Sequence, residues 1–481
     1  MSKKKSNTPQ MTKDVRRAIE ELSRDLRANK FVKGEMQFTD ITNRDYFLKA
    51  FGDKIRFCVK YNKFLIWNGT CWEVDNDGYV EEECVEFVHQ MYRGLRFITD
   101  LELQRAFEKH LIKSESFRRI QSLIGLLKMS KTIKVRDCDL DNDSYLFNTD
   151  KVTLDLKNGK GLPPDPKHLS TKKSSFVYKN DAKCPTWDKF LMQIFDNDFD
   201  LIHFVQKAMG YALCGDVKEQ CIFILWGTGA NGKSTFLNTL QKLFGDYACS
   251  TATETFMKKT SEQSNDLARL KGMRLVTTTE IEQGKAISES LIKQITGGDM
   301  ITARFLYGEF FSFIPTFKIF MATNHKPKIR GSDNGIWRRI KMIPFTVTIP
   351  QKQRDGDLGK KLLAENSGIL NWLIQGFKMW KKEGLCEEPD AIKNANEEYR
   401  MDMDSVGTFI MECFTIDASM KIREGNTQVY NTYLKWCTKN NERALSQKSL
   451  TIRMQEKGFK RCVSNSQRFW LGLVMKNEWR S

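Results

Sequence analysis

The sequence predicts an α/β fold: a parallel sheet flanked by helices, an α+β region before it and a small helix and hairpin region after it. An apolar run, CIFILW, leads into the glycine-rich GTGANGKS, and an amphipathic helical pattern, TFLNTLQKLFG, follows. Two later strand-like runs, 274–279 and 317–324, each lead into a polar residue. Strands that alternate with helical segments indicate a parallel sheet with crossover helices.

The composition of the 481 residues narrows the class of protein. Hydrophobic residues make up 40% and aromatic residues 11%, which suits about two to four domains with cores and excludes a disordered chain. The net charge of +17 favours a polyanionic partner such as nucleic acid, although charge can also simply keep a basic protein in solution. No apolar run approaches the roughly 18 residues of a membrane helix, and MSKKKSNTPQ does not begin a secretory signal. We expect a cytoplasmic protein that does not bind membranes.

Four regions can be separated along the chain. Residues 1–40 are a basic tail that passes into a charged helix, 41–205 form the α+β domain, 206–390 hold the candidate chemistry, and 400–481 have their own pattern. In the last region two helical segments precede two strands around a polar turn, with Ser446 as the cap of the second helix and Gly458 as its end. This order is typical of a DNA-binding winged helix; the alternative is a small helical lid that packs on the core.

The stretch GTGANGKS matches the phosphate-loop pattern GxxxxGK[ST], and it has the strand before it and the helix after it that the motif requires. Backbone amides of such a loop surround the phosphates of ATP at a helix N-terminus. Lys233 would bridge the β- and γ-phosphates, and Ser234 would ligate Mg²⁺. The expected ATP-binding residues are Gly227, Thr228, Gly229, Ala230, Asn231, Gly232, Lys233, Ser234 and Thr235.

Polar residues at the ends of the two later strands complete the expected catalytic site. Glu280 follows the run 274–279 and Glu282 lies two residues on, so both can face one metal from a strand. We favour Glu280 to hold Mg²⁺ and to orient the attacking water, whereas Glu282 can equally be a solvated carboxylate at a helix start. Asn324 ends the next strand and suits a sensor of the γ-phosphate, although a lone asparagine there can also be an ordinary turn residue.

Two further segments have expected roles. In GIWRRIKMIPF, an exposed arginine lies where ring ATPases place a finger that reaches the neighbouring subunit; we expect Arg339, with Arg338 as the alternate, against surface arginines paired with acids. Between the two strands, MITARFL and FFSFIP predict a hairpin whose tip includes Tyr307 and Gly308. Such a hairpin can push a DNA strand, or can simply pack in the core.

The phosphate loop, TEIEQGK, LIKQITGGDMITAR, MATNHKPKIRG and IWRRIKMIPF, in this order, resemble superfamily 3 helicases. More narrowly, they resemble the ATPase module of the phage and plasmid primase–helicases, which are related to the poxvirus primase–helicase. Segments 62–75, 145–166, 184–195 and 209–216 resemble the domain that precedes the helicase in that family. The resemblance implies an AAA+ fold in a homo-hexameric ring that moves on single-stranded or forked DNA, in a bacterial cytoplasm.

The resemblance also assigns residues. It supports Glu280, Asn324 and Arg339 in the roles above, and its motif around the Gly-Gly turn matches Lys293, Gly297, Gly298, Asp299 and Arg304. The chain departs from the family where Phe305 follows Arg304 and where the tip lacks a lysine. Contacts to DNA are therefore expected from Arg304, from stacking on Tyr307 and from the backbone of Gly308.

A primase domain is not expected, because the roughly 200 residues before the phosphate loop already match the preceding domain. A separate primase would then act beside this chain. Alternating acids at 137, 139, 141 and 143 can in principle hold two metals for nucleotidyl transfer, but we interpret them as a solvated acidic turn. The leading hypothesis is an ATP-dependent DNA helicase for replication of a phage, plasmid or other mobile element. The alternatives are a bifunctional primase–helicase and an ATP-switched initiator or loader.

Overall fold

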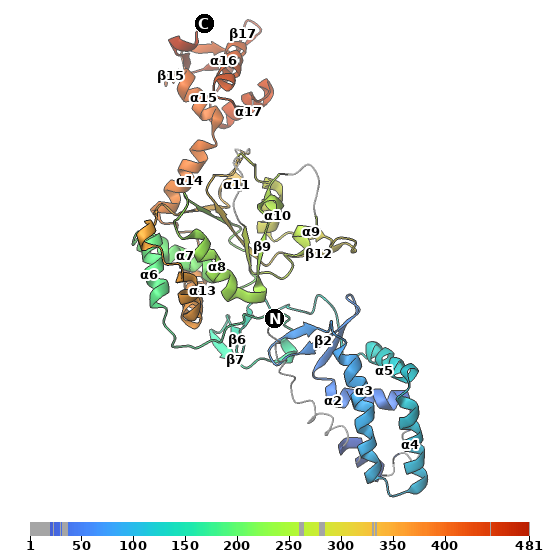
Figure 1. Ribbon diagram of the computed structural model, residues 1–481. Helices are drawn as coiled ribbons and strands as arrows, with labels where there is room; N and C mark the ends of the chain where they lie inside the picture. Colours follow the sequence, from blue (N-terminus) through green and yellow to red (C-terminus); the bar gives the residue numbers. More distant parts are fainter. Residues whose placement is uncertain are drawn as a thin grey trace. The chain divides into compact units, whose positions relative to one another are not determined.

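The computed structural model describes residues 20–22, 24–28, 30, 37–258, 264–278, 284–329, 331, 334–442 and 444–480. These residues form two compact units. The first takes the described residues within Met1–Cys184, Lys242–Tyr247 and Leu363–Ile374, and the second those within Pro185–Gln241, Ala248–Leu362 and Gln375–Ser481. Figure 1 shows the chain coloured along its sequence. No helix in the described ranges is both long and apolar enough to cross a membrane.

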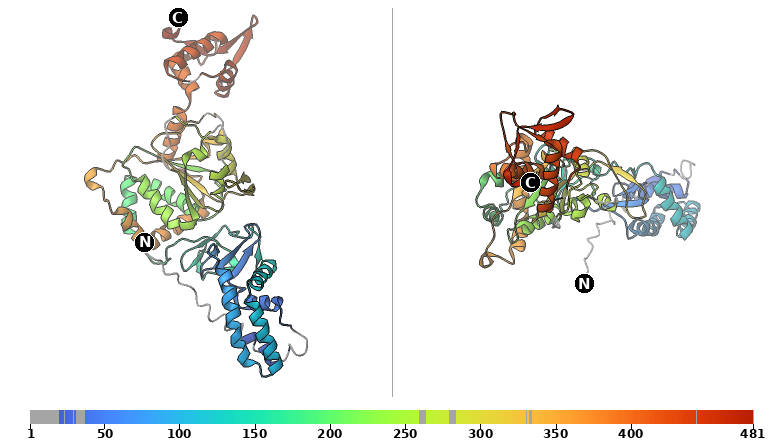
Figure 2. Two further views of the ribbon diagram at one scale, coloured as in Figure 1. Left: turned by 45° about the vertical axis from the view of Figure 1, so that its right-hand side comes forward. Right: turned by 90° about the horizontal axis from the view of Figure 1, so that it is seen from above.

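The first unit combines a group of packed helices with two small sheets. The helices pack against one another (Figure 2) and are α2 (Asp40–Phe51), α3 (Tyr79–Met91), α4 (Leu101–Ser114) and α5 (Phe117–Met129). One sheet has the order β3-β2-β1-β4, with β1 (Ile55–Cys58), β2 (Lys63–Trp67), β3 (Trp72–Val74) and β4 (Lys134–Val135). The other joins β5 (Leu146–Asn148), β6 (Thr153–Asp155) and β7 (Lys160–Leu162). The expected mixture of α and β elements is confirmed.

The second unit is built on a five-stranded parallel sheet. Its order is β14-β8-β13-β10-β9, from β8 (Ile222–Trp226), β9 (Ala248–Thr251), β10 (Leu275–Thr278), β13 (Lys318–Thr323) and β14 (Ile340–Pro344). Every residue of β10 is buried, as are all but the last of β8, because helices cover both faces of a parallel sheet. The predicted parallel α/β architecture is confirmed.

Alternate strand residues face the two helical layers. Ile222 and Ile224 belong to one core cluster with Ile292 of α10 and Tyr399 of α14. On neighbouring strands, Phe223 stacks on Phe320 at 4.5 Å between ring centroids. The helices of this part of the chain are α6 (Pro185–Ile194), α7 (Phe199–Tyr211), α8 (Lys233–Phe244), α9 (Ser264–Ala268), α10 (Glu289–Gly297), α11 (Asn334–Trp337), α12 (Leu358–Ala364), α13 (Asn366–Glu383) and α14 (Asp390–Asp402).

The hairpin predicted between the strands β10 and β13 is present. Strands β11 (Ile301–Ala303) and β12 (Phe311–Phe313) pair antiparallel, with Ile301 opposite Phe313. Ile301 and Phe313 are buried whereas the tip is exposed. The base of the hairpin thus packs on the core and its tip is open.

The two helices and the hairpin that the sequence predicts in the C-terminal segment are present. Helix α16 (Asn426–Lys439) precedes α17 (Gln447–Glu456), where Ser446 Oγ accepts from Ser449 N at 3.2 Å. Gly458, with φ 88°, follows α17, a conformation that suits glycine. Strands β17 (Arg461–Ser464) and β18 (Gln467–Leu471) form the hairpin, and β16 (Arg423–Gly425) joins β18. The segment also contains α15 (Ser405–Cys413), β15 (Phe414–Ile416) and β19 (Leu473–Met475).

Candidate functional site

The glycine-rich loop 227–232 connects β8 to α8 and is held by close backbone contacts. A Cβ on Gly227 would lie 2.1 Å from the carbonyl oxygen of Phe345, and one on Gly232 would lie 2.6 Å from Ile194 Cγ2. Gly232 also has φ 86°, a left-handed conformation that side chains disfavour. Only glycine fits these two positions without moving the neighbouring chain.

Within the loop, the buried side chain of Asn231 bonds to a neighbouring segment of the chain. Its amide donates to the carbonyl oxygen of Phe345 at 3.2 Å, and the amide of Ile349 donates to the carbonyl of Ala230 at 2.8 Å. By contrast Thr228, Gly229 and Ala230 are exposed. Hydrogen bonds therefore hold the inner side of the loop, whereas its outer residues are exposed to solvent.

Lys233 brings together the ends of two strands. Its side chain is buried, and its ammonium donates to the carbonyl of Gly227 at 2.5 Å, to Asn231 Oδ1 at 3.2 Å and to Asn324 Oδ1 at 3.1 Å. Asn324 directly follows β13, whose Thr323 pairs with Trp226 at the end of β8. Two residues that the sequence analysis singled out for one site thus touch at the carboxyl edge of the sheet.

The remaining loop residues lie at the start of α8. Ser234 is exposed and follows Lys233, while Thr235 is half-buried. Glu280 and Glu282 lie outside the described residues. Strand β10 is described to Thr278, beside Met321 of β13, and the roles of the two glutamates stay predictions.

Arg339 is not the exposed arginine that the sequence analysis expected. It is buried, and its guanidinium donates to Thr296 Oγ1 at 3.0 Å, to the carbonyl of Gly335 at 2.6 Å and to Gln220 Oε1 at 3.3 Å. These bonds compensate the desolvation of the buried charge within its own chain. Arg338 is exposed, and it also donates to Gln220 Oε1 at 3.3 Å. The arginine that is open to a partner is therefore Arg338.

The tip of the hairpin has the expected residues in exposed positions. Tyr307 is 100% exposed with φ 62°, and Gly308 N donates to the carbonyl of Phe305 at 2.8 Å. The guanidinium of Arg304 lies 4.7 Å from the centroid of Phe310. At the base, Gly298 takes φ 79° and caps α10, with Lys293 and Gly297 within the helix and Asp299 after it. The Gly-Gly turn is thus a helix end that leads into β11.

The alternating acids of the first unit are engaged with cations and amides. Asp137 pairs with Lys60 at 2.6 Å and Asp143 with Lys157 at 3.1 Å. Asp139 pairs with Arg136 at 2.8 Å, and Asp141 Oδ1 accepts from Thr171 N at 2.7 Å. No group of three or more potential metal ligands occurs in the part of the chain that the structure describes. These contacts support the interpretation as an acidic turn.

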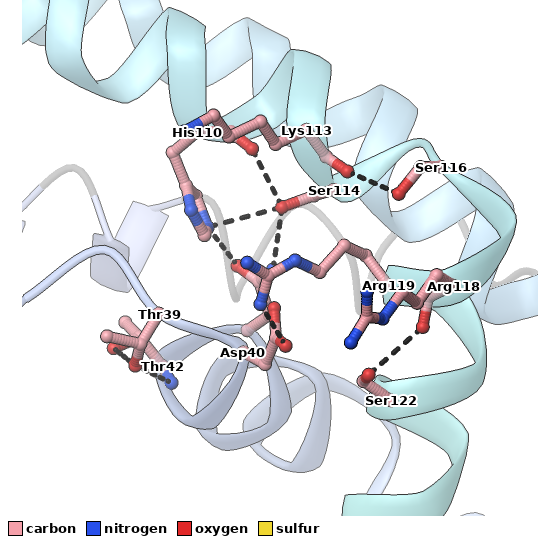
Figure 3. A network of polar contacts seen from close by, with 11 residues as sticks. Thr39, Asp40, Thr42, His110, Lys113, Ser114, Ser116, Arg118, Arg119 and Ser122 are labelled. Atoms are coloured by element: carbon pink, nitrogen blue, oxygen red, sulfur yellow. Dashed lines mark hydrogen bonds and ion pairs between the residues drawn. The ribbon is translucent and has the colours of Figure 1, made fainter.

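A polar network joins three helices of the first unit (Figure 3). Arg119 of α5 pairs with Asp40 of α2 at 2.6 Å, while His110 Nε2 of α4 lies 3.0 Å from Asn43 Oδ1 of α2. The Asn43 amide donates to Ser114 Oγ at 3.1 Å. Burial lowers the pKa of His110, which favours the neutral form of its ring where the helices meet. The network ties the three helices together.

Sequence reasoning missed two residues that the structure places beside predicted ones. Gln220, in a left-handed conformation with φ 50°, binds both arginines, and Lys326 contacts the strand that precedes the glycine-rich loop. Gln220 precedes its arginine partners by 118 and 119 residues. No local pattern could have indicated either contact.

Comparison with known families places two parts of the chain. Residues 44–196 match the family described as D5 N terminal like, and residues 225–339, which include Lys233, Asn324 and Arg339, match a family of unknown function, DUF5906. A solved structure, the apo form of the NrS-1 C-terminal region, aligns over 91% of this chain and 100% of its own with a TM-score of 0.53 at 10% identity. At this identity the similarity shows only that the two chains share a fold.

Sequence relatives come from viruses and from a virophage. A protein of Acanthamoeba polyphaga mimivirus whose name proposes a helicase is 29% identical over 326 residues, 63% of this chain and 34% of the relative. A Sputnik virophage protein, also named for a helicase, is 25% identical over 464 residues, 87% of this chain and 56% of the relative. An African swine fever virus protein named for a primase is 22% identical over 277 residues, covering 53% of this chain and 29% of the relative. This chain therefore spans about a third to just over half the length of these relatives. Together, the two family matches and these relatives show that the chain is similar to viral proteins named as helicases or primases, with a D5 N terminal like region at residues 44–196.

Proposed function

We propose that the chain is an ATP-dependent DNA helicase that works as a ring in the replication of a virus, phage or other mobile element. The observation on which this rests is the contact of Lys233 with Asn324 at the carboxyl edge of the parallel sheet, 3.1 Å between Nζ and Oδ1. Because β8 lies between β13 and β14, the loop, the asparagine and the arginine segment belong to three adjacent strands. This arrangement supports an AAA+ core.

The residues at this edge fit ATP with Mg²⁺. The ammonium of Lys233 bonds to carbonyl and amide oxygens, which phosphate oxygens can replace. A Cβ on Gly229 would meet nothing within 4 Å, so the outer side of the loop has space for a ligand. The start of α8 adds positive potential. Ser234 would hold Mg²⁺, which neutralises developing phosphate charge, and Glu280 would orient water. Asn324 would contact the γ-phosphate.

The position of the arginines supports a ring. Arg338 and Arg339 precede β14, whereas Lys233 follows β8, its parallel neighbour. The five residues of β14, at about 3.3 Å each, separate the two sheet edges by roughly 16 Å. Arg338 therefore lies too far away to reach the phosphates bound by Lys233 of its own chain, and we propose that it acts on the neighbouring subunit's ATP.

Two exposed features would contact DNA. The hairpin tip offers Arg304, the Tyr307 ring and the Gly308 backbone to a single strand, and aromatic stacking binds bases without sequence preference. The C-terminal segment, which we interpret as a winged helix, exposes Lys448, Lys460 and Arg468 on or beside α17 and the β17–β18 hairpin. These cations would bind DNA phosphates.

The test is ATP hydrolysis and fork unwinding by the full chain. We expect single-stranded DNA to stimulate hydrolysis and a forked duplex to be separated, while Lys233→Ala abolishes both and Lys242→Ala, at an exposed position of the same helix, leaves both unchanged. Hydrolysis that is indifferent to DNA, without strand separation, would contradict the proposal. Specific duplex binding with slow turnover would instead identify an initiator or loader.

Oligonucleotide synthesis from nucleoside triphosphates tests the primase alternative. The name of the African swine fever virus relative is the observation that favours this alternative. Synthesis by the full chain would make it bifunctional. The ion pairs of the acids 137–143 argue against a metal pair there.

A further inference from the structure

The turn that carries Asn324 is held from outside the sheet by α14. The ammonium of Lys326, two residues after Asn324, forms ion pairs with Asp402 Oδ2 at 2.6 Å and Glu398 Oε1 at 3.1 Å. These two carboxylates are four residues apart, and therefore lie on one face of α14. Between them, the hydroxyl of Tyr399 donates to the carbonyl oxygen of Pro327. Three contacts thus join the turn to one helix.

The same ammonium also touches the strand that leads into the glycine-rich loop. Lys326 Nζ lies 4.6 Å from the centroid of the Trp226 ring, and Trp226 immediately precedes Gly227. Trp226 is the register partner of Thr323, so the turn folds back over the end of its neighbouring strand. The Lys326 side chain is only 10% exposed, which means that three segments meet at one largely desolvated cation.

Helix α14 also contacts the sheet through residues other than those that bind Lys326. Tyr399 is fully buried in the core cluster that includes strands β8, β13 and β14, and Asn396 Oδ1 accepts from the backbone of Met342 at 3.0 Å. Helix α14 is therefore anchored to the sheet independently of Lys326. Ion pairs at an exposed surface contribute little, but two carboxylates that hold a largely buried ammonium against a fixed helix restrict where the turn can lie.

We infer that Lys326 is a positioning residue for Asn324: it holds the turn so that the Asn324 amide stays directed toward Lys233 and the γ-phosphate. This inference rests on the proposed function, because it concerns the same hydrolytic site. Lys326 is not among the residues that we expect to bind ATP. Its removal should therefore affect turnover more than affinity, since a misplacement of about 1 Å can lower a rate by up to ~100-fold.

The test separates kcat from KM for DNA-stimulated ATP hydrolysis. For Lys326→Met we expect kcat to fall by roughly 10- to 100-fold while KM for ATP stays within about twofold, because Lys233 and the loop amides provide the affinity. Lys326→Arg, which keeps the cation, should recover most of kcat. Asp402→Asn, which leaves the Glu398 ion pair in place, should lower kcat by a smaller factor. If Lys326→Met does not fold, the last two variants supply the comparison.

Lys393→Met is the matched control. Lys393 lies on α14 and pairs with Asp390 at 3.3 Å, but both side chains are exposed and neither contacts the turn. Its kcat and KM should equal those of the wild type. The wild type tests the proposed function itself: if it does not hydrolyse ATP, that function is wrong and the inference falls with it. If the wild type is active and Lys326→Met keeps its kcat, or changes only KM, the inference alone is wrong; where Lys326→Met does not fold, an unchanged kcat of Asp402→Asn has the same meaning.

Discussion

The ammonium of Lys233 lies 3.1 Å from Oδ1 of Asn324, although 91 residues separate them in the chain. The contact joins the residue that follows the glycine-rich loop to the residue that follows the neighbouring strand. An amide at this position can bond to a γ-phosphate and to the water that attacks it. We therefore propose that the two side chains have separable roles, one in binding and one in turnover.

We predict that Asn324→Ala lowers kcat for ATP hydrolysis by about 100-fold, the usual effect of removing one bond to the transition state. Nucleotide affinity, measured with a fluorescent ATP analogue, should change little because Lys233 remains. Lys328→Ala, at an exposed position of the same turn, is the control. Loss of affinity equal to the loss of rate would show that Asn324 is a binding residue.

The two adjacent arginines should behave differently. Arg338→Ala should lower hydrolysis by about 1,000-fold or more, as expected for a finger, without a change in Tm. Arg339→Ala should lower the free energy of unfolding by about 3 kcal/mol, because Thr296 and Gln220 lose their partner and the packing of a buried side chain is lost. Thermal unfolding beside ATPase assays distinguishes the two effects.

The subunit that Arg338 serves can be tested by mixing. Arg338→Ala protein keeps its loop, and Lys233→Ala protein keeps its arginine, so a mixed ring contains some complete sites between subunits. We expect the mixture to recover part of the ATPase activity that each variant lacks alone. An activity equal to the average of the two variants at every ratio would rule out action between subunits.

The hairpin tip should contribute to DNA binding and not to folding. Tyr307→Ala should weaken single-stranded DNA binding by about 1–3 kcal/mol, measured by fluorescence anisotropy, and should leave hydrolysis without DNA unchanged. Thr302→Ala, in the hairpin base where Thr302 Oγ1 lies 3.0 Å from Ser312 Oγ, is the control. Equal DNA affinity of the Tyr307→Ala variant and the wild type would show that the strand does not stack there.

Lys318 should make stability depend on pH. Burial lowers the pKa of its ammonium to about 8, and its partners are the carbonyl of Cys214 and the Tyr211 ring, 4.3 Å away. The unfolded chain, with a pKa of about 10.4, binds the proton more tightly than the folded chain. Between these two values the lysine's contribution to the free energy of unfolding therefore rises with pH.

Lys318→Met removes this titration. The difference in unfolding free energy between wild type and Lys318→Met, measured in urea from pH 7 to 10, should shift in favour of the wild type as pH rises. Below pH 8 both states of the wild type hold the proton, and the difference should be constant. A constant difference across the whole range would contradict the lowered pKa.

Much of the site could be predicted because its signals are local. The GxxxxGKS spacing and the apolar strand before it indicated Lys233, and the polar residue directly after β13 indicated Asn324. The hairpin tip at Tyr307 followed from two short apolar runs. The exposure of the arginines could not be predicted. Adjacent residues point in different directions. The partners of the buried Arg339 are Thr296 and Gln220, which lie 43 and 119 residues away in the sequence.

The sequence by itself determined the parallel α/β core, the glycine-rich loop and the order of strands, helices and hairpin, because strand and helix periodicity and turn chemistry act over a few residues. Only the tertiary structure decided that Arg338 is exposed and not Arg339, that the arginines lie at the opposite edge of the sheet from Lys233, and that α14 supports Asn324 through Lys326. These outcomes depend on strand order and on contacts between distant segments. Such contacts form only when the whole sheet and its helices have packed.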